Sequence, residues 1–162
     1  MSELKGACIF GQSGGPTSVI NASAYGVIAT ALKNPNITRV LGAEHGIKGV
    51  LNDRLFDMGQ EDPAELELLK YTPSSALGSC RYKLPENLDA SVYTLLFEKF
   101  EQLNIGAVFY IGGNDSMDTI KKLSDFAILT GQKQKFLGVP KTIDNDLALT
   151  DHTPGFGSAA KY

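Results

Sequence analysis

The stretch Phe-Leu-Gly-Val-Pro-Lys-Thr-Ile-Asp-Asn-Asp, residues 136–146, carries the strongest structural signal in this chain. Its first four residues form a short apolar run that is typical of a buried strand, and the run ends at Pro140. The next six residues contain one lysine, one threonine and two aspartates. In an α/β protein, ligands bind just beyond the carboxyl ends of the strands. The segment therefore predicts a site that handles a phosphate, a metal ion or a proton, with an ordinary polar loop as the alternative.

Strand and helix signals alternate along the rest of the chain. Apolar runs predict strands at residues 7–10, 39–43, 105–111 and 136–139, and a short extended piece at 55–58. Apolar residues at three- and four-residue spacing predict helices across residues 19–31, 63–69, 92–100 and 117–128. This order predicts an α/β fold, a Rossmann-like three-layer sandwich with right-handed crossovers and a mainly parallel sheet. The loops at 11–16, 112–116 and 140–146 should then meet at one edge of that sheet.

Several boundaries follow from local signals. Asp62 and Pro63 predict the start of the third helical segment, and Asn87 or Asp89 is expected to cap the next one. Residues 44–53 are rich in glycine and are expected to form a loop. Residues 157–162 resemble the opening turns of a helix, so we expect the chain to be part of something longer.

Composition excludes several classes of function. The net charge of −3 and the pI of about 5.3 argue against a nucleic-acid-binding surface, which needs a clustered basic face. No run approaches the roughly 18 apolar residues of a membrane helix, and residues 1–5 lack the apolar core of a signal peptide. Cys8 and Cys80 lie far apart, and we interpret both as reduced thiols of a cytoplasmic protein.

Two glycine-rich turns follow predicted strands. The turn at residues 11–16 could admit phosphate oxygens to backbone N–H groups, or could be a tight strand–helix connection. The turn at residues 112–116 adds Asp115, which could approach magnesium through water or exclude a bulky group. The alternative is that Asp115 or Asn114 caps the following helix.

Two further side chains stand in polar loops. Arg81 could clamp a phosphoryl group through two parallel hydrogen bonds, or could be a solvated surface arginine. His152 could bind phosphate or transfer a proton, and a loop histidine without such a role fits the sequence equally well.

Taken together in chain order, these motifs resemble the phosphofructokinase family. The resemblance rests on Gln12-Ser13-Gly14-Gly15-Pro16 with Asn21, on Gly78-Ser79-Cys80-Arg81, on the glycine pair at 112–113, on Pro140-Lys141-Thr142-Ile143-Asp144-Asn145-Asp146 and on residues 150–156. It covers nearly the whole chain, and the Thr-Ile-Asp-Asn-Asp core is highly specific. Lys141 and Asp115 resemble the pyrophosphate-dependent branch, because the ATP-dependent branch usually has glycine at both positions.

The resemblance implies an activity and a role for each matching residue. The family phosphorylates the 1-hydroxyl of fructose 6-phosphate, with pyrophosphate or ATP as donor and Mg²⁺ as cofactor. Asp144 matches the general base, Lys141 and Arg81 match groups that stabilise the transition state, and Thr142 and Asp146 match residues that position the sugar. Residues that match the donor contacts are Gly15, Gly113 and Asp115. The chain would then be the donor-binding part of a larger, homo-oligomeric enzyme and inactive alone.

One residue departs from the family pattern. Asn114 stands where the family usually has an aspartate that engages magnesium, and its amide oxygen carries no charge. The alternatives are an ATP-dependent phosphofructokinase, another kinase with a Gly-Gly-Asp-type loop, and a non-catalytic phosphate-binding or interaction module. Comparing pyrophosphate with ATP as donors separates the first alternative from the preferred interpretation.

Overall fold

A computed structural model describes residues 5–17, 19–153 and 156–162. Pro154 and Gly155, which belong to the family-like segment at 150–156, lie outside the described residues. The strands are β1 (Gly6–Gln12), β2 (Ile37–Ala43), β3 (Leu55–Asp57), β4 (Ile105–Gly112) and β5 (Lys135–Pro140). The helices are α1 (Ile20–Leu32), α2 (Ile47–Leu51), α3 (Pro63–Leu68), α4 (Ser91–Gln102), α5 (Asn114–Thr130) and α6 (Phe156–Lys161), with a 3₁₀ turn at Met58–Gln60.

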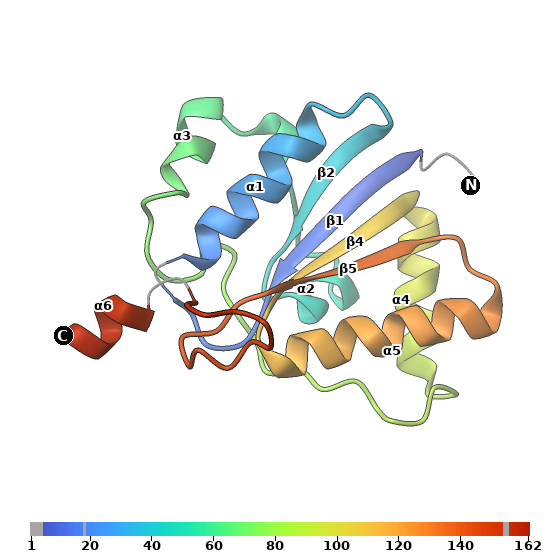
Figure 1. Ribbon diagram of the computed structural model, residues 1–162. Helices are drawn as coiled ribbons and strands as arrows, with labels where there is room; N and C mark the ends of the chain where they lie inside the picture. Colours follow the sequence, from blue (N-terminus) through green and yellow to red (C-terminus); the bar gives the residue numbers. More distant parts are fainter. Residues whose placement is uncertain (1–4, 18, 154–155) are drawn as a thin grey trace.

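The strands form one five-stranded sheet in the order β3-β2-β1-β4-β5 (Figure 1). Only β3 pairs antiparallel, with β2, so the predicted mainly parallel sheet is confirmed. In register, Gln12 lies opposite Ile111 and Gly112 lies opposite Pro140. The carboxyl ends of β1, β4 and β5 are therefore level, and the loops that follow them begin side by side.

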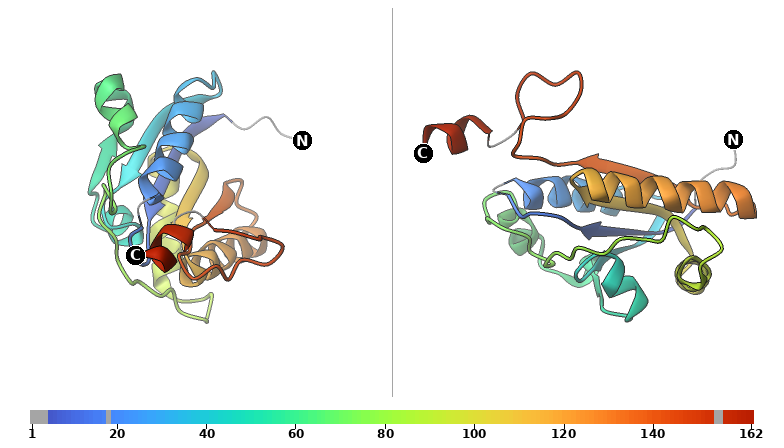
Figure 2. Two further views of the ribbon diagram at one scale, coloured as in Figure 1. Left: turned by 60° about the vertical axis from the view of Figure 1, so that its left-hand side comes forward. Right: turned by 90° about the horizontal axis from the view of Figure 1, so that it is seen from below.

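Helices cover both faces of the sheet, which gives the predicted three layers (Figures 1 and 2). On one face, Ile20, Ala24 and Ile28 of α1 pack against Cys8 and Phe10 of β1. On the other face α2, α4 and α5 share a core rich in aromatic rings, and its largest side chains include Tyr93, Phe97 and Phe100. Beyond the carboxyl edge, α6 extends away from the sheet (Figure 2).

Three local expectations were wrong. Residues 136–139 were expected to form a buried strand, but β5 lies at the edge of the sheet and none of its residues is buried. Residues 44–53 include a helix, α2, where a loop was predicted. A Cβ at Gly49 would lie 2.1 Å from the Glu44 carbonyl oxygen, so glycine here allows a close backbone approach inside a helix. Helix α4 begins after Ala90 without a side-chain cap. Asn87 instead accepts a hydrogen bond from the amide of Asp89, a local turn that competes with helix capping.

Other boundaries agree with the sequence. Asp62 accepts from the amide of Ala64 and Pro63 opens α3, as expected. Gly131 ends α5 in the left-handed conformation with φ 69°. Both cysteines are free thiols. Among the described residues, no helix combines the length and apolar character needed to cross a membrane.

Candidate functional site

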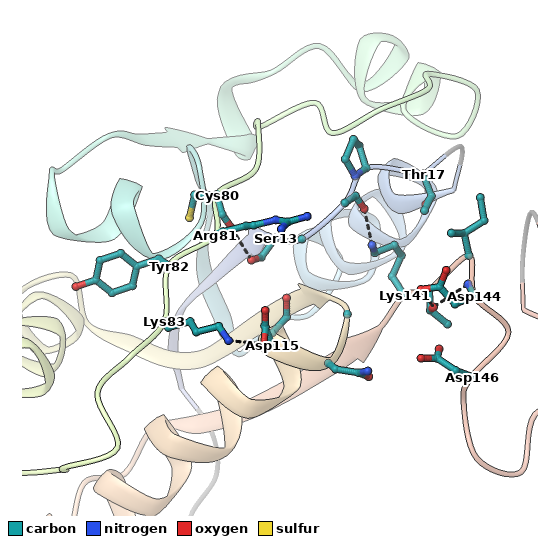
Figure 3. A pocket seen from close by; sticks show the side chains of 18 residues that line it. Ser13, Thr17, Cys80, Arg81, Tyr82, Lys83, Asp115, Lys141, Asp144 and Asp146 are labelled. Carbon is teal, nitrogen blue, oxygen red and sulfur yellow. Dashed lines mark hydrogen bonds and ion pairs between the residues drawn. The ribbon is translucent and has the colours of Figure 1, made fainter.

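A cavity of about 480 Å³ lies at the carboxyl edge of the sheet. Its lining comes from four segments: residues 13–17 after β1, residues 80–83, residues 113–116 at the start of α5, and residues 141–144 with Asp146 after β5. The structure thus brings together the nine residues that the family resemblance assigned to the site, namely Gly15, Arg81, Gly113, Asn114, Asp115, Lys141, Thr142, Asp144 and Asp146. Figure 3 shows Arg81, Asp115, Lys141, Asp144 and Asp146 around this cavity. His152 is exposed, lies edge-on to Phe156 and does not line this cavity.

The β1–α1 loop leaves open space at the cavity. Gly14 has φ 78°, a conformation that favours glycine. A Cβ added at Gly15 would meet no heavy atom within 4 Å, so packing within this chain does not require glycine there. Space beside exposed backbone suits a ligand whose oxygens approach main-chain N–H groups.

The N-terminus of α5 also faces the cavity. Its N-cap is Gly113, and no side chain caps the helix, so the proposed capping by Asn114 or Asp115 is wrong. Uncapped N–H groups and the helix dipole together favour an anion at this end of the helix. A Cβ at Gly112 would lie 2.6 Å from the carbonyl oxygen of Ser13, which shows how closely the two glycine-rich turns approach.

The segment after β5 is held by local hydrogen bonds. The Lys141 amide donates to the Gly112 carbonyl at 2.9 Å, which continues the strand pairing into the loop. The Asp144 amide donates to Thr142 Oγ1 at 3.0 Å, while the Asp144 carboxylate is exposed. Asn145 spans the loop, because its side chain donates to Asp151 O and accepts from the amide of Thr153. These contacts place the Asp144 carboxylate in the cavity lining.

Lys141 crosses the cavity toward the first loop. Its Nζ donates to the carbonyl oxygen of Gly15. Partial burial lowers the pKa of Lys141 from its ordinary value of 10.5, and the negative charge of Asp144 opposes that shift. The ammonium group therefore lies between the loop after β1 and the carboxylate after β5.

Sequence reasoning missed Lys83. It forms an ion pair with Asp115 at 3.4 Å, and both side chains are largely exposed. In Figure 3, Arg81 and Lys83 extend toward the cavity, whereas Tyr82 between them points the other way. Alternate side chains of an extended segment share a side, so the two-residue spacing from Arg81 was the available signal.

The charges of the lining are mixed. Arg81, Lys83 and Lys141 supply three cations, while three aspartates supply carboxylates: Asp115, Asp144 and Asp146. Among the described residues there is no group of three or more His, Cys, Asp or Glu side chains arranged to hold a metal ion. The arrangement can neutralise an anionic ligand and offer it one carboxylate as a proton acceptor.

Comparisons with known proteins agree with this geometry. The family model described as Phosphofructokinase matches residues 7–162. The chain is 43% identical over 159 residues to the pyrophosphate–fructose 6-phosphate 1-phosphotransferase of Rhodospirillum rubrum, covering 98% of this chain and 38% of that protein. It superposes with a TM-score of 0.89 and 48% identity on the pyrophosphate-dependent phosphofructokinase of Nitrosospira multiformis, covering 99% of this chain and 39% of the other. The ATP-dependent 6-phosphofructokinase of Clostridium tetani is 35% identical over 147 residues, covering 91% of this chain and 42% of that protein.

Proposed function

The chain belongs to the phosphofructokinase family, and from this premise we propose that it is the donor-binding part of a pyrophosphate-dependent phosphofructokinase. The reaction is transfer of a phosphoryl group from pyrophosphate to the 1-hydroxyl of fructose 6-phosphate, giving fructose 1,6-bisphosphate and phosphate. The observation that carries the proposal is the cavity shared by Gly15, Arg81, Lys141 and Asp144. The chain spans about 38% of the length of its Rhodospirillum rubrum relative. We use the term complete enzyme for the proposed full-length protein of which this chain is a part.

Different residues of the cavity lining carry out proton transfer, charge neutralisation and positioning of the sugar. Asp144 takes the proton of the sugar hydroxyl as that oxygen forms its bond to phosphorus. The bond between phosphorus and the bridging oxygen breaks, and phosphate leaves. Arg81 and Lys141 lie where they can neutralise the charge on the phosphoryl oxygens, which is the main task of a protein in phosphoryl transfer. We assign to Thr142 and Asp146 the roles that the family resemblance implies, which are to position the sugar and to order the loop.

The donor phosphates fit between two backbone turns. Gly15 leaves space on one side, and the uncapped N-terminus of α5 at Gly113 lies on the other. Asp115 lies beside this space, where it would exclude the nucleoside portion of a larger donor. Its ion pair with Lys83 is exposed and offsets only part of its charge, so like-charge repulsion would add to exclusion by bulk.

A divalent metal ion would bind at this site together with the donor phosphates, and the side chains alone would not hold it. Mg²⁺ is usually held by one or two carboxylates together with substrate phosphates and water. The neutral Asn114 side chain and the lack of a metal cluster among the described residues agree with that mode of binding. Asp115 or Asp144 would supply the carboxylate beside the donor phosphates, and Mg²⁺ held there would neutralise charge on those phosphates.

The complete enzyme, assayed with pyrophosphate and separately with ATP, tests the proposed donor. We expect a large preference for pyrophosphate. Asp115→Gly should improve use of ATP, and Asp115→Asn, which keeps the bulk and removes the charge, should improve it less. Lys141→Gly should mainly reduce use of pyrophosphate. Equal use of the two donors by the unmodified enzyme would contradict the donor assignment and would leave the family assignment intact.

The proposal also covers the cellular compartment and the oligomeric state of the enzyme. We propose a cytoplasmic enzyme, in agreement with two free thiols at Cys8 and Cys80. We also propose that the complete enzyme is a homo-oligomer, which light scattering of the purified protein would test. A monomer at assay concentration would contradict that part of the proposal.

A further inference from the structure

Arg81 lies on a long segment that has no helix or strand of its own. We define the strap as residues 72–86, which connect the region of α3 to that of α4 and pass along the cavity. Among the described residues, no hydrogen bond or ion pair to the Arg81 side chain is found. The position of its guanidinium group therefore depends on how the strap backbone is held. Beside Arg81, Ser13 Oγ donates to Cys80 O at 3.0 Å and Ser79 Oγ donates to Gly14 O, so the two ends of the strap decide how Arg81 is oriented about this central contact.

The first part of the strap is fixed by two fully buried amides. Gln12 of β1 and Asn21 of α1 hydrogen-bond to each other at 2.8 Å. Gln12 Oε1 also accepts from Ser75 Oγ and the Leu77 amide, both at 3.0 Å. Asn21 contacts the strap twice more, donating to Thr72 O and accepting from the amide of Ala76. This end is joined directly to the sheet.

The last part of the strap is fixed by Lys122 of α5. Its side chain is only 9% exposed, which is unusual for lysine. The ammonium group donates to Leu84 O at 3.2 Å, to Glu86 Oε1 at 2.6 Å and to Asp118 Oδ2 at 2.7 Å. An ammonium group has three donors, so all of its hydrogen-bonding capacity is used. Hydrogen bonds to Asp118 and Glu86 raise the pKa of Lys122, which keeps it charged.

We propose that Lys122 is a positioning residue that holds the end of the strap and thereby places Arg81 against the transferred phosphoryl group. The role rests on the proposed function, because Arg81 is the group through which Lys122 acts. Lys122 is not one of the residues that line the cavity. Misplacement of a reacting or stabilising group by about 1 Å can cost roughly 100-fold in rate, so a remote anchor can control turnover.

Lys122→Met in the complete enzyme is the informative variant. Methionine fills much of the buried volume, and it leaves no buried charge without a partner because the side chains of Glu86 and Asp118 are 90% and 54% exposed. The matched control is Lys121→Met. Lys121 is the neighbouring residue on α5, is 73% exposed and, among the described residues, forms an ion pair only with Asp125 on its own helix. The control loses the same charge without releasing the strap.

We expect Lys122→Met to lower kcat roughly 10–100-fold with little change in the KM for fructose 6-phosphate, and Lys121→Met to match the unmodified enzyme. In an Arg81→Ala background, Lys122→Met should cause no further loss, because the anchored group is already gone. An unchanged kcat for Lys122→Met would overturn the proposal. A full additional loss in the Arg81→Ala background would also overturn it, since it would show a role independent of Arg81.

A second readout does not depend on activity. Trypsin cleavage after Arg81 and Lys83 should be faster in Lys122→Met than in Lys121→Met, with thermal unfolding monitored in parallel. Equal cleavage rates would overturn the anchoring role even if the enzyme had a different donor or substrate. Conversely, faster cleavage in an enzyme without pyrophosphate activity would support the anchor and contradict the proposed function.

Discussion

Asp144→Asn in the complete enzyme removes the proposed base and changes its loop very little. The Asp144 amide donates to Thr142 Oγ1 at 3.0 Å, and this main-chain contact survives the substitution. The carboxylate is exposed, and its Oδ2 lies 3.5 Å from Thr142 Oγ1, too far for a strong hydrogen bond. We therefore expect the free energy of unfolding to change by no more than about 0.5 kcal/mol.

The expected loss of activity is much larger than this change in stability. Loss of a general base lowers turnover roughly 10²–10⁴-fold. At about 1.4 kcal/mol for each factor of ten, the activation barrier rises by about 3–6 kcal/mol. A loss of that size cannot arise from partial unfolding when stability is unchanged. Affinity for fructose 6-phosphate should change much less, because asparagine retains the size and polarity of the side chain.

Steady-state formation of fructose 1,6-bisphosphate measures the effect, with thermal unfolding recorded on the same preparations. Asp151→Asn is the matched control, because Asp151 lies in the same exposed loop and outside the cavity lining. Only its backbone oxygen contacts Asn145, and that contact survives the change. Near-normal turnover of Asp144→Asn, or an equal loss in Asp151→Asn, would refute the assignment of Asp144 as base.

Three further outcomes follow from the described contacts. Gly15→Ala should fold normally, because its Cβ meets nothing within 4 Å, and should raise the KM for pyrophosphate; an unchanged KM would argue against donor contact at Gly15. Because the pKa of Lys141 is lowered from 10.5, kcat/KM for pyrophosphate should fall as pH rises through that lowered value and the ammonium loses its charge. Lys141→Arg should move this decline to higher pH, and a profile identical to that of the unmodified enzyme would exclude Lys141 as its cause. Burial raises the pKa of Cys8 to about 11, so a thiol reagent at neutral pH should modify Cys80 first, and pyrophosphate should slow that reaction because Cys80 lines the cavity.

The part of the site that comes from the sheet could be predicted from sequence, because apolar runs and the turns that end them are local signals. Residues 105–112 and 135–140 show this, since each apolar strand leads directly into the polar residues that line the cavity. The resemblance to a known family then supplied the roles. Helix α2 was missed because Gly49, which permits close packing against Glu44, looks like a loop residue in sequence.

The strap could not be placed from sequence, because its position depends on contacts between residues far apart in the chain. Gln12 meets Leu77 across 65 positions, and Lys122 meets Leu84 across 38. Neither contact leaves a periodic signal in residues 72–86. Arg81 was therefore recognised from its motif alone, and its neighbour Lys83 was missed.

The charges of the cavity explain why the strap matters for an anionic donor. Lys83 is paired with Asp115, and Lys141 lies close enough to Asp144 for that charge to affect its pKa. Each of these lysines already has a carboxylate beside it, whereas Arg81 has no such partner among the described residues. Arg81 and the N-terminus of α5 are thus the positive groups most available to incoming phosphates. The α5 backbone is fixed by its own hydrogen bonds, whereas the position of Arg81 depends on the strap. The contacts that hold the strap therefore control where Arg81 lies relative to the donor phosphates.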